Sequence, residues 1–219
     1  MNTYQTLKDY CTNHTTTLVA VSKTKPNSAI MDLYEQGQRV FGENRVQELV
    51  DKEASLPKDI VWHMIGHLQT NKVKHIAPFI DLVHSGDRLS LIKELNKEAI
   101  KSSRTIDLLL QIKIAQEDSK YGWDIDSLIQ EMENGLLSRF ENIKIRGVMG
   151  MATFTDDENQ ITTEFENLKS YFDQLKNDYF LNSDSFDTLS MGMSGDYKLA
   201  VASGSNMIRV GSLLFGARN

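Results

Sequence analysis

Residues 16–26, with the sequence TTLVAVSKTKP, form the stretch around which the rest of the chain is organised. The apolar, β-branched run within it is typical of a buried strand, and Pro26 ends that run. Lys23 at the tip of such a strand is unusual, because an ammonium group is costly to remove from water. A partly desolvated lysine has a lowered pKa, which leaves its amine available to attack a carbonyl carbon. The simpler alternative is that Lys23 reaches bulk water, and this stretch alone favours that alternative.

The composition is that of an ordinary soluble globular protein: 219 residues, 40% hydrophobic and 25% charged. The 24 basic and 30 acidic side chains give a formal charge of −6, which argues against a general nucleic-acid-binding protein. The single Cys11 cannot form an intramolecular disulfide, as is usual in a reducing compartment. The chain has no apolar run of membrane-spanning length and no signal-peptide pattern, so we expect a cytoplasmic protein without a membrane partner.

Further short apolar runs follow residues 16–26 and alternate with helical patterns. They are residues 39–44, 60–66, 81–86, 106–114, 143–151, 188–193 and 207–212. Strands alternating with helices, without a long linker, indicate parallel βαβ units in one domain of residues 1–219. The strand count of about eight predicts a closed (β/α)₈ TIM-type barrel, with an extra N-terminal helix over residues 3–13. An open doubly wound sheet is the alternative, but no Gly-x-Gly-x-x-Gly motif follows the first strand.

Potential anion-binding residues follow the last two expected strands. Ser194-Gly195-Asp196 opens a short helix, so backbone N–H groups and a hydroxyl are directed toward one point. Gly211-Ser212 adds a second approach to backbone amides and another hydroxyl. Barrels often bind phosphate with the loops after strands seven and eight, so the two segments together predict a phosphate site.

A phosphate site beside a lysine on the neighbouring first strand indicates pyridoxal 5′-phosphate. The phosphate would anchor this cofactor, and Lys23 would condense with its aldehyde as a Schiff base. Lys25 has the same strand parity but lies in the loop immediately before Pro26. We therefore predict Lys23 as the residue that forms the Schiff base.

Several motifs together resemble the pyridoxal phosphate homeostasis protein family, in the same order along nearly the whole chain. They are residues 20–26 (AVSKTKP), 41–44 (FGEN), 62–72 (WHMIGHLQTNK), 189–194 (LSMGMS) and 208–212 (IRVGS). The resemblance implies the barrel of the alanine racemase N-terminal domain, with Lys23 as the cofactor lysine. It places phosphate-binding elements on Ser194, Gly211 and Ser212, and Arg209 at the pyridine nitrogen. Asn44 and Met193, also at strand ends, complete the expected set of cofactor-binding residues.

The sequence departs from the family pattern in two places. The N-terminal helix is shorter than is usual, and the loop after the fifth strand, residues 117–122, keeps only the spacing of the family's Glu, Lys and Gly. Neither departure touches the expected cofactor residues.

Arg209 bears on the type of function. A guanidinium is a donor only and stays charged. At the pyridine nitrogen it would keep that nitrogen unprotonated, which makes the ring a poor electron sink. We therefore expect a cofactor-holding protein, a monomer or weak dimer without catalytic residues, that buffers pyridoxal phosphate or delivers it to apo-enzymes that require it.

Two alternatives remain open. One is an amino-acid racemase or decarboxylase of the same fold, although the chain ends at Asn219 and leaves no further domain to supply a base on the opposite face. Tyr121 is a conceivable donor on that face. The other alternative is a cofactor-free aldolase-type barrel that uses Lys23 as a Schiff base. Arg209 and the whole-chain resemblance argue against it.

Other polar residues are expected to be structural. His63 and His67 have a spacing that suits a metal pair only on a helix, and the signals there are for a strand, so no metal site is predicted. Arg146 is expected to pair with an inward-facing carboxylate such as Glu43. Asp157 lies in an acidic loop before a helix, where its charge favours the helix dipole.

Overall fold

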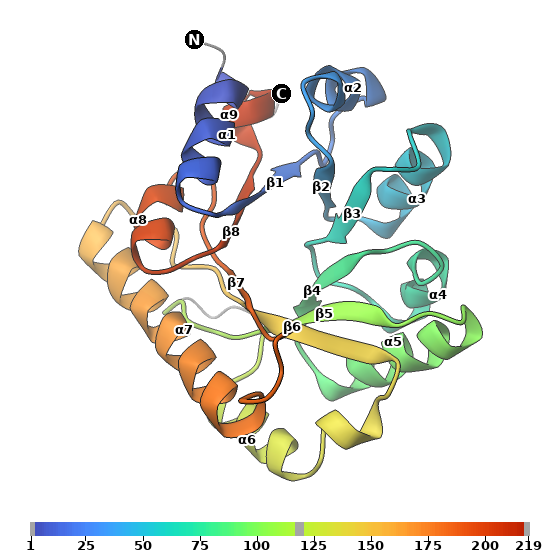
Figure 1. The fold of residues 1–219 in the computed structure, drawn as a ribbon, viewed down its shortest axis with the longest axis vertical. Helices are drawn as coiled ribbons and strands as arrows, with labels where there is room; N and C mark the ends of the chain where they lie inside the picture. The colour runs from blue at the N-terminus through green and yellow to red at the C-terminus, as the bar shows by residue number, and fades with distance from the viewer. Residues whose placement is uncertain (1–2, 117–120, 217–219) are drawn as a thin grey trace.

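The strands expected from the apolar runs are present, and they close into a barrel (Figure 1). The structure is a computed structural model that describes residues 3–116 and 121–216. Within these ranges the strands are β1 (Thr17–Val21), β2 (Val40–Glu43), β3 (Val61–Met64), β4 (Leu82–Gly86), β5 (Ile106–Gln111), β6 (Ile143–Met149), β7 (Thr188–Ser190) and β8 (Met207–Val210). All neighbouring pairs are parallel, and β8 pairs with β1 to close the ring. The predicted (β/α)₈ barrel is confirmed. The open sheet is excluded because β1 has hydrogen-bonded partners on both sides.

Several strands end earlier than their apolar runs predicted. β7 ends at Ser190 instead of Met193, and β8 ends at Val210 instead of Ser212. Gly192 has a φ of +98°, a left-handed conformation that interrupts extended backbone and that glycine adopts without strain. The residues beyond these strands form loops at the C-terminal end of the barrel, where barrels gather their ligand groups.

Helices surround the barrel, and α1 and α9 lie side by side (Figure 1). They are α1 (Thr3–Asn13), α2 (Asn27–Glu35), α3 (Val46–Ser55), η1 (Thr70–Lys72), α4 (Val73–Ile76), α5 (Leu89–Lys101), α6 (Ile125–Glu133), η2 (Leu137–Arg139), α7 (Glu158–Tyr179), α8 (Tyr197–Ala202) and α9 (Ser212–Phe215). The expected N-terminal helix is present as α1. In the described parts of the chain, every helix is too short or too polar to cross a bilayer.

The polar residues at the starts of α2 and α5 are of the types that usually cap helices, but none of them does so. Neither Asn27 nor Ser28 caps α2; Pro26 occupies that position with extended backbone and makes no side-chain capping bond. Likewise Arg88, and not Asp87 or Ser90, occupies the cap position of α5. The Asp87 carboxylate is instead paired with His67 and Arg88. By contrast, Asp157 caps α7 by accepting two backbone N–H groups, as its place before the helix predicted.

The apolar core has two layers. A small inner layer fills the barrel interior with Val19, Leu82, Leu109, Met149 and Met207. A larger outer layer packs the strands against the helices and includes the fully buried rings of Phe41, Phe165 and Phe186.

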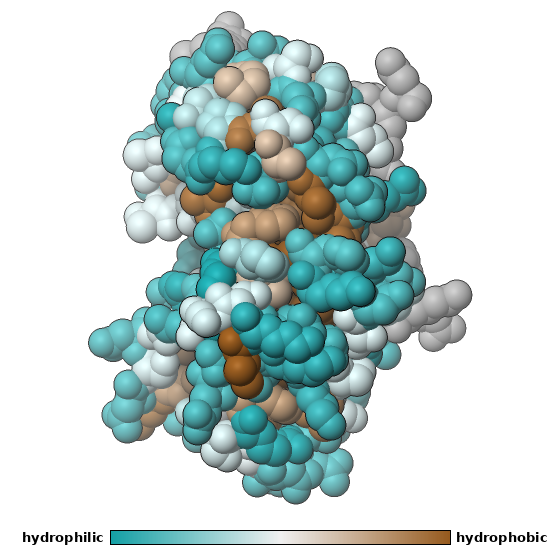
Figure 2. All heavy atoms as spheres, turned by 90° about the vertical axis from the view of Figure 1, so that its right-hand side faces the viewer, coloured by the Kyte–Doolittle hydropathy of each residue, from teal (hydrophilic) through white to brown (hydrophobic). Residues whose placement is uncertain are grey.

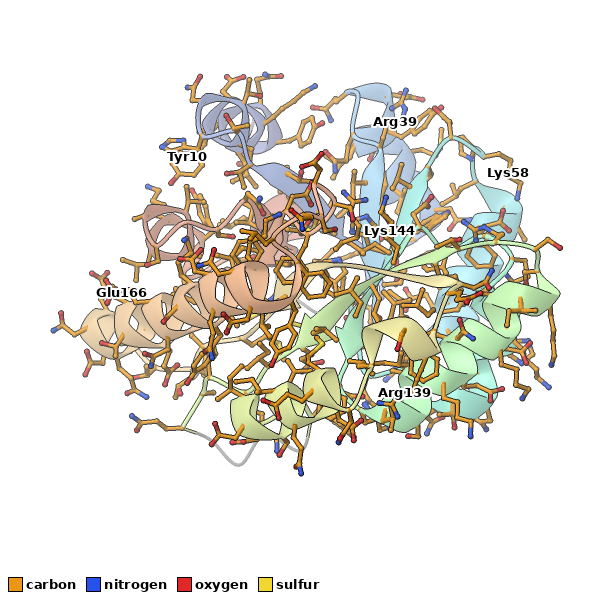
Figure 3. The ribbon with its side chains drawn as sticks, turned by 60° about the horizontal axis from the view of Figure 1, so that its bottom comes forward. Tyr10, Arg39, Lys58, Arg139, Lys144 and Glu166 are labelled. Atoms are coloured by element: carbon orange, nitrogen blue, oxygen red, sulfur yellow. The ribbon has the colours of Figure 1, made fainter. Side chains whose placement is uncertain are left out.

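The outside is mostly hydrophilic on the face shown in Figure 2. Charged side chains such as Arg39, Lys58, Arg139 and Glu166 lie at the periphery in Figure 3. The helices thus cover the barrel and leave its C-terminal end for function.

The expected pair of Arg146 with Glu43 is wrong, because the two residues lie at opposite ends of the barrel. Arg146 on β6 donates to Asp107 Oδ2 at 2.6 Å, and its Nη2 lies 3.4 Å from Asp187, the residue before β7. Both carboxylates lie near the N-terminal ends of their strands. Glu43 is the last residue of β2, at the C-terminal end. Its cationic partner is a lysine from α3, described below.

Candidate functional site

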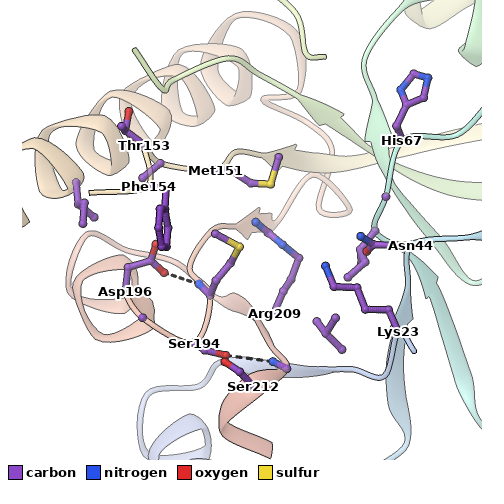
Figure 4. Close-up of a pocket in the computed structure, with 18 of the residues that line it drawn as sticks. Lys23, Asn44, His67, Met151, Thr153, Phe154, Ser194, Asp196, Arg209 and Ser212 are labelled. Atoms are coloured by element: carbon purple, nitrogen blue, oxygen red, sulfur yellow. Dashed lines mark hydrogen bonds between the residues drawn. The ribbon is translucent and has the colours of Figure 1, made fainter. Parts of the chain in front are cut away.

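A cavity of about 660 Å³ opens at the C-terminal ends of the strands (Figure 4). It is lined by all the predicted cofactor-binding residues, which are Lys23, Asn44, Met193, Ser194, Arg209, Gly211 and Ser212. Lys23 and Asn44 follow β1 and β2, Met193 and Ser194 follow β7, and the remaining three come from β8 and the start of α9. The closed barrel therefore brings together segments from the two ends of the sequence.

Lys23 lies in a tight turn just beyond β1, and its side chain projects into the cavity that Arg209 also enters (Figure 4). The Lys25 N–H donates to the Ser22 carbonyl oxygen at 3.0 Å and closes this turn. Thr24 within it has a φ of +65°, which is uncommon for a β-branched residue. Something outside the turn must stabilise this conformation.

The loops after β7 and β8 are tied to each other. The Gly211 N–H donates to Ser194 Oγ at 3.2 Å, and the Met193 N–H donates to Asp196 Oδ1 at 2.5 Å (Figure 4). A Cβ on Gly211 would lie 3.2 Å from the carbonyl oxygen of Val21, so glycine allows this loop to approach β1 closely. The first N–H groups of α9 have no acceptor within their own helix. Together with two hydroxyls, they form a donor set that suits a phosphate.

Arg209 is buried, with only 5% of its surface exposed, and its guanidinium is fixed at two atoms. Nη1 donates to Ser190 Oγ at 2.6 Å, and Nη2 donates to the Gly150 carbonyl oxygen at 2.9 Å. Burial lowers the pKa of Arg209 to about 10, so the guanidinium remains charged at neutral pH. The cavity therefore holds a permanent cation with remaining N–H donors.

Two histidines continue the hydrogen bonding behind Arg209. Ser190 Oγ lies 3.3 Å from His84 Nδ1, and His84 Nε2 lies 3.0 Å from His63 Nδ1. Burial lowers the pKa of His63 to about 3 and that of His84 well below its ordinary value, so both rings are neutral at pH 7. His63 is thus packed in the interior, in agreement with the structural role expected for it. Among the described residues, no group of His, Cys, Asp and Glu is placed to hold a metal ion.

Lys25 also lines the cavity, but its amine is used elsewhere. Its Nζ donates to the carbonyl oxygen of Phe215, the last residue of α9, at 2.9 Å. This contact ties the turn that carries Lys23 to the helix that begins at Ser212. The Lys25 amine is thus directed toward α9, whereas the Lys23 side chain projects into the cavity (Figure 4).

Sequence reasoning missed a buried ionic cluster beneath the Lys23 turn. Lys52 Nζ on α3 lies 2.8 Å from Glu43 Oε1 and 2.6 Å from Glu48 Oε1. Glu43 is fully buried, and its Oε2 has no hydrogen-bond partner. Burial raises the pKa of Glu43, and the hydrogen bonds from Lys52 and Ser22 oppose that increase. A usable signal was present: Glu48 and Lys52 are four residues apart on the helix that follows the acidic strand tip.

Aromatic rings also line the cavity on two sides: His67 lies on the side of Asn44 and Lys23, and Phe154 lies near Asp196 (Figure 4). Tyr121 stacks on His67 with ring centroids 3.8 Å apart, and Phe154 at the rim is 96% exposed. Tyr121 lines the cavity, which is the position that a proton donor in the racemase alternative would need. Of the loop that departs from the family pattern, residues 117–120 lie outside the described residues.

These features define a class of protein: a parallel (β/α)₈ barrel with a lysine after its first strand and a phosphate-type donor set after its last two. The family model described as "Alanine racemase, N-terminal domain" matches residues 2–219. The pyridoxal phosphate homeostasis protein of Aquifex aeolicus is 37% identical over 202 residues, covering 92% of this chain and 86% of that protein. That of Escherichia coli K12 is 38% identical over 210 residues, covering 93% and 86%. The chain belongs to the alanine racemase N-terminal domain family and, within it, to the pyridoxal phosphate homeostasis proteins.

Solved structures agree with this assignment. PipY of Synechococcus elongatus PCC7942, solved with PLP bound, is 37% identical with a TM-score of 0.82, covering 92% of this chain and 93% of that one. Alanine racemase from Bartonella henselae is 18% identical with a TM-score of 0.70, and the match covers 98% of this chain and 57% of the racemase. At that identity the racemase shows the shared fold alone.

Proposed function

We propose that this protein binds pyridoxal 5′-phosphate reversibly on Lys23 and takes part in pyridoxal phosphate homeostasis. The observation that carries the proposal is the meeting of Lys23 with the linked loops of Ser194 and Gly211 in one cavity. Relatives that share more than a third of the sequence carry that name, and one was solved with PLP bound.

Each residue has a defined task in this proposal. The hydroxyls of Ser194 and Ser212 and the first N–H groups of α9 bind the phosphate, whose two negative charges suit these donors, while the Gly211 N–H holds Ser194 Oγ in place. The bound group supplies an aldehyde carbon. The Lys23 nitrogen adds to that carbon, the carbonyl oxygen leaves as water with the two amine protons, and a C=N bond remains. Hydrolysis reverses the step and releases the group unchanged. Asn44 and Met193 line the space between these two ends.

Arg209 supports holding the cofactor over amino-acid chemistry. Its guanidinium is fixed by Ser190 and Gly150 and stays charged at neutral pH. A charged donor directed at a ring nitrogen already supplies a hydrogen bond to its lone pair and disfavours a second positive charge there, so the nitrogen stays unprotonated. An unprotonated ring withdraws electrons weakly. We propose that the protein is a buffer or donor of pyridoxal phosphate for apo-enzymes that require it, and not an enzyme with strong turnover.

The experiment that tests the site uses the visible absorbance of protein incubated with pyridoxal phosphate. Lys23→Ala should abolish the yellow band, because no amine at that position can form the C=N bond. Lys25→Ala is the control and should largely keep the band, since its amine contacts α9 instead. Borohydride reduction followed by peptide mapping should place the label on Lys23. A label on Lys25 or elsewhere would refute the assignment.

A second experiment tests the absence of strong turnover. Moving an α-proton between the two faces of a substrate requires a positioned base on each face. Tyr121, stacked on His67, is the side chain considered for the second base. In deuterated water with a panel of L-amino acids, we expect negligible α-deuterium incorporation. Rapid incorporation that depends on both Lys23 and Tyr121, with steady product formation, would favour the racemase alternative.

A further inference from the structure

The ionic cluster of Glu43, Glu48 and Lys52 contacts the backbone on both sides of Lys23. On one side, Lys52 Nζ donates to the Ser22 carbonyl oxygen at 2.9 Å, and Ser22 Oγ donates to Glu43 Oε1 at 2.6 Å. On the other side, the Thr24 N–H donates to Glu48 Oε1 at 2.6 Å. The residues before and after Lys23 are therefore both bound to one cluster.

The turn that these contacts hold is not one the chain adopts readily. Thr24 has a φ of +65°, and the left-handed region is strained for a β-branched side chain. A negatively charged acceptor for the Thr24 N–H offsets this cost, because hydrogen bonds to charged groups are among the stronger ones. Glu48 supplies that acceptor and is itself held by Lys52.

Stability alone does not account for the cluster. The Lys52 and Glu43 side chains are 5% and 0% exposed, and Glu43 leaves one carboxylate oxygen without a hydrogen-bond partner. Buried ion pairs of this kind often contribute less than well-packed apolar side chains would. The cluster nevertheless joins the end of β2 to α3 beside the turn, where its contacts fix a backbone geometry that apolar packing could not.

We propose that Glu48, supported by Lys52 and Glu43, is a positioning residue that holds the turn of residues 22–24 so that the Lys23 amine meets the aldehyde of the bound group. This rests on the proposed function, because it assigns the cluster to the formation of the C=N bond. The loops after β7 and β8, which build the phosphate end of the cavity, contribute no group to the contacts of Glu43, Glu48 and Lys52 with Ser22 and Thr24. The contact between this turn and α9 is a separate one, made by Lys25 Nζ. The cluster therefore acts on the covalent step and not on phosphate binding.

The test compares two ligands. Pyridoxal 5′-phosphate can form the C=N bond, whereas pyridoxine 5′-phosphate carries an alcohol in place of the aldehyde and cannot. In Glu48→Ala, the Thr24 N–H loses its acceptor, so affinity for pyridoxal 5′-phosphate should fall about tenfold, as expected for one hydrogen bond to a charged group. Affinity for pyridoxine 5′-phosphate should be unchanged.

Two further variants make the comparison decisive. Glu48→Gln keeps an oxygen that can accept from the Thr24 N–H but loses the charge. The hydrogen bond is then weakened and not lost, so affinity for pyridoxal 5′-phosphate should fall only about threefold, and affinity for pyridoxine 5′-phosphate should not change. If Glu48→Ala does not fold, this variant decides the question. Glu53→Ala is the matched control, because Glu53 also lies on α3 but pairs with the exposed Lys58. It should change neither affinity.

The outcomes separate this inference from the proposed function. An equal loss of both ligands in the Glu48 variants, or no loss in either variant, would overturn the positioning role. The proposed function fails in a different way: the unchanged protein would then bind both ligands equally well, and Lys23→Ala would make no difference. A preference for the aldehyde that depends on Lys23 but not on Glu48 would refute the positioning role of Glu48 and leave the proposed function intact.

Discussion

The two basic side chains that enter the cavity, Lys23 and Arg209, are supported in opposite ways. Behind Lys23 lies a cluster of ions on β2 and α3, in which Lys52 is paired with Glu43 and Glu48. Behind Arg209 lies a row of neutral groups, Ser190, His84 and His63. The first cluster binds the backbone around Lys23, whereas the second row begins at the guanidinium itself.

This difference corresponds to two different tasks. A group that must remain a charged donor in one place is best fixed at its charged atoms by neutral acceptors that do not titrate near neutral pH. A lysine that forms and breaks a covalent bond needs a fixed starting point on the backbone. One cavity can thus combine a rigid donor with a reactive amine, because the first is fixed at its charged atoms and the second at its backbone.

The largest expected effect comes from breaking the ionic cluster. Lys52→Met removes the cation between Glu43 and Glu48, and separating a buried ion pair in this way typically costs about 3–5 kcal/mol of folding free energy. Burial already raises the pKa of Glu43, so this carboxylate can take up a proton when its cation is removed. A neutral carboxyl is less costly to bury, and we therefore expect a loss at the lower end of the range, about 3 kcal/mol. Urea unfolding measures it. Lys97→Met on α5, which removes ion pairs with Glu94 and Glu98 at a more exposed site, should leave the transition unmoved. An unchanged midpoint for Lys52→Met would contradict the comparison.

The phosphate end should give the next largest effect, in binding instead of folding. Ser194→Ala or Ser212→Ala removes a hydroxyl donor to the phosphate, and a hydrogen bond to a charged group contributes about 1.5–3 kcal/mol. Affinity for pyridoxal 5′-phosphate should therefore fall by about one to two decades, since about 1.4 kcal/mol corresponds to tenfold. Affinity for pyridoxal, which lacks the phosphate, should stay the same. Equal binding of the two compounds by the unchanged protein would rule out the anchor.

The histidine row gives the smallest effect and a distinct pH dependence. His63 and His84 have lowered pKa values in the folded protein, so only the unfolded chain takes up their protons as the pH falls through 6.5. Their contribution to stability is present above that pH and is lost toward pH 3. Between pH 6.5 and 5.5 each neutral histidine should cost on the order of 1 kcal/mol. His84→Gln should remove about half of this combined loss in urea unfolding at the two pH values. An unaltered slope would show that His84 is charged in the folded state.

At Glu43, on the other side of the cavity, a fall in pH should change the stability in the opposite direction. Burial raises the pKa of Glu43 above its ordinary value of 4.5, so its contribution to stability is present below that value and is lost as the pH rises through the raised pKa. His75→Gln is a control for the histidine measurement, because His75 is an exposed residue on α4. The two supports should thus be separable by pH as well as by mutation.

Local patterns were enough to predict the barrel and a group of residues that line one cavity. The alternation of apolar runs with helical segments predicted the strand order, because each strand must be buried on both faces. Residues at strand ends were then expected to meet, and the seven predicted cofactor residues do line one cavity. Strand length was overestimated at β7 because the apolar run continues into a loop whose first residues, Met191 and Gly192, are also buried. It was overestimated at β8 because Gly211 and Ser212 turn into α9.

The sequence by itself therefore determined the class of fold and a set of strand-end residues, including Lys23 and the candidate phosphate loops, that line one cavity, since burial periodicity and turn chemistry are local properties. Only the tertiary structure decided which polar groups pair. It placed Arg146 beside Asp107 instead of Glu43, Lys25 on the end of α9, and His63 and His84 in one row behind Arg209. The physical reason is that such pairs depend on the register of the closed barrel and on height along its axis. Neither quantity is written in the spacing of residues along a single strand or helix.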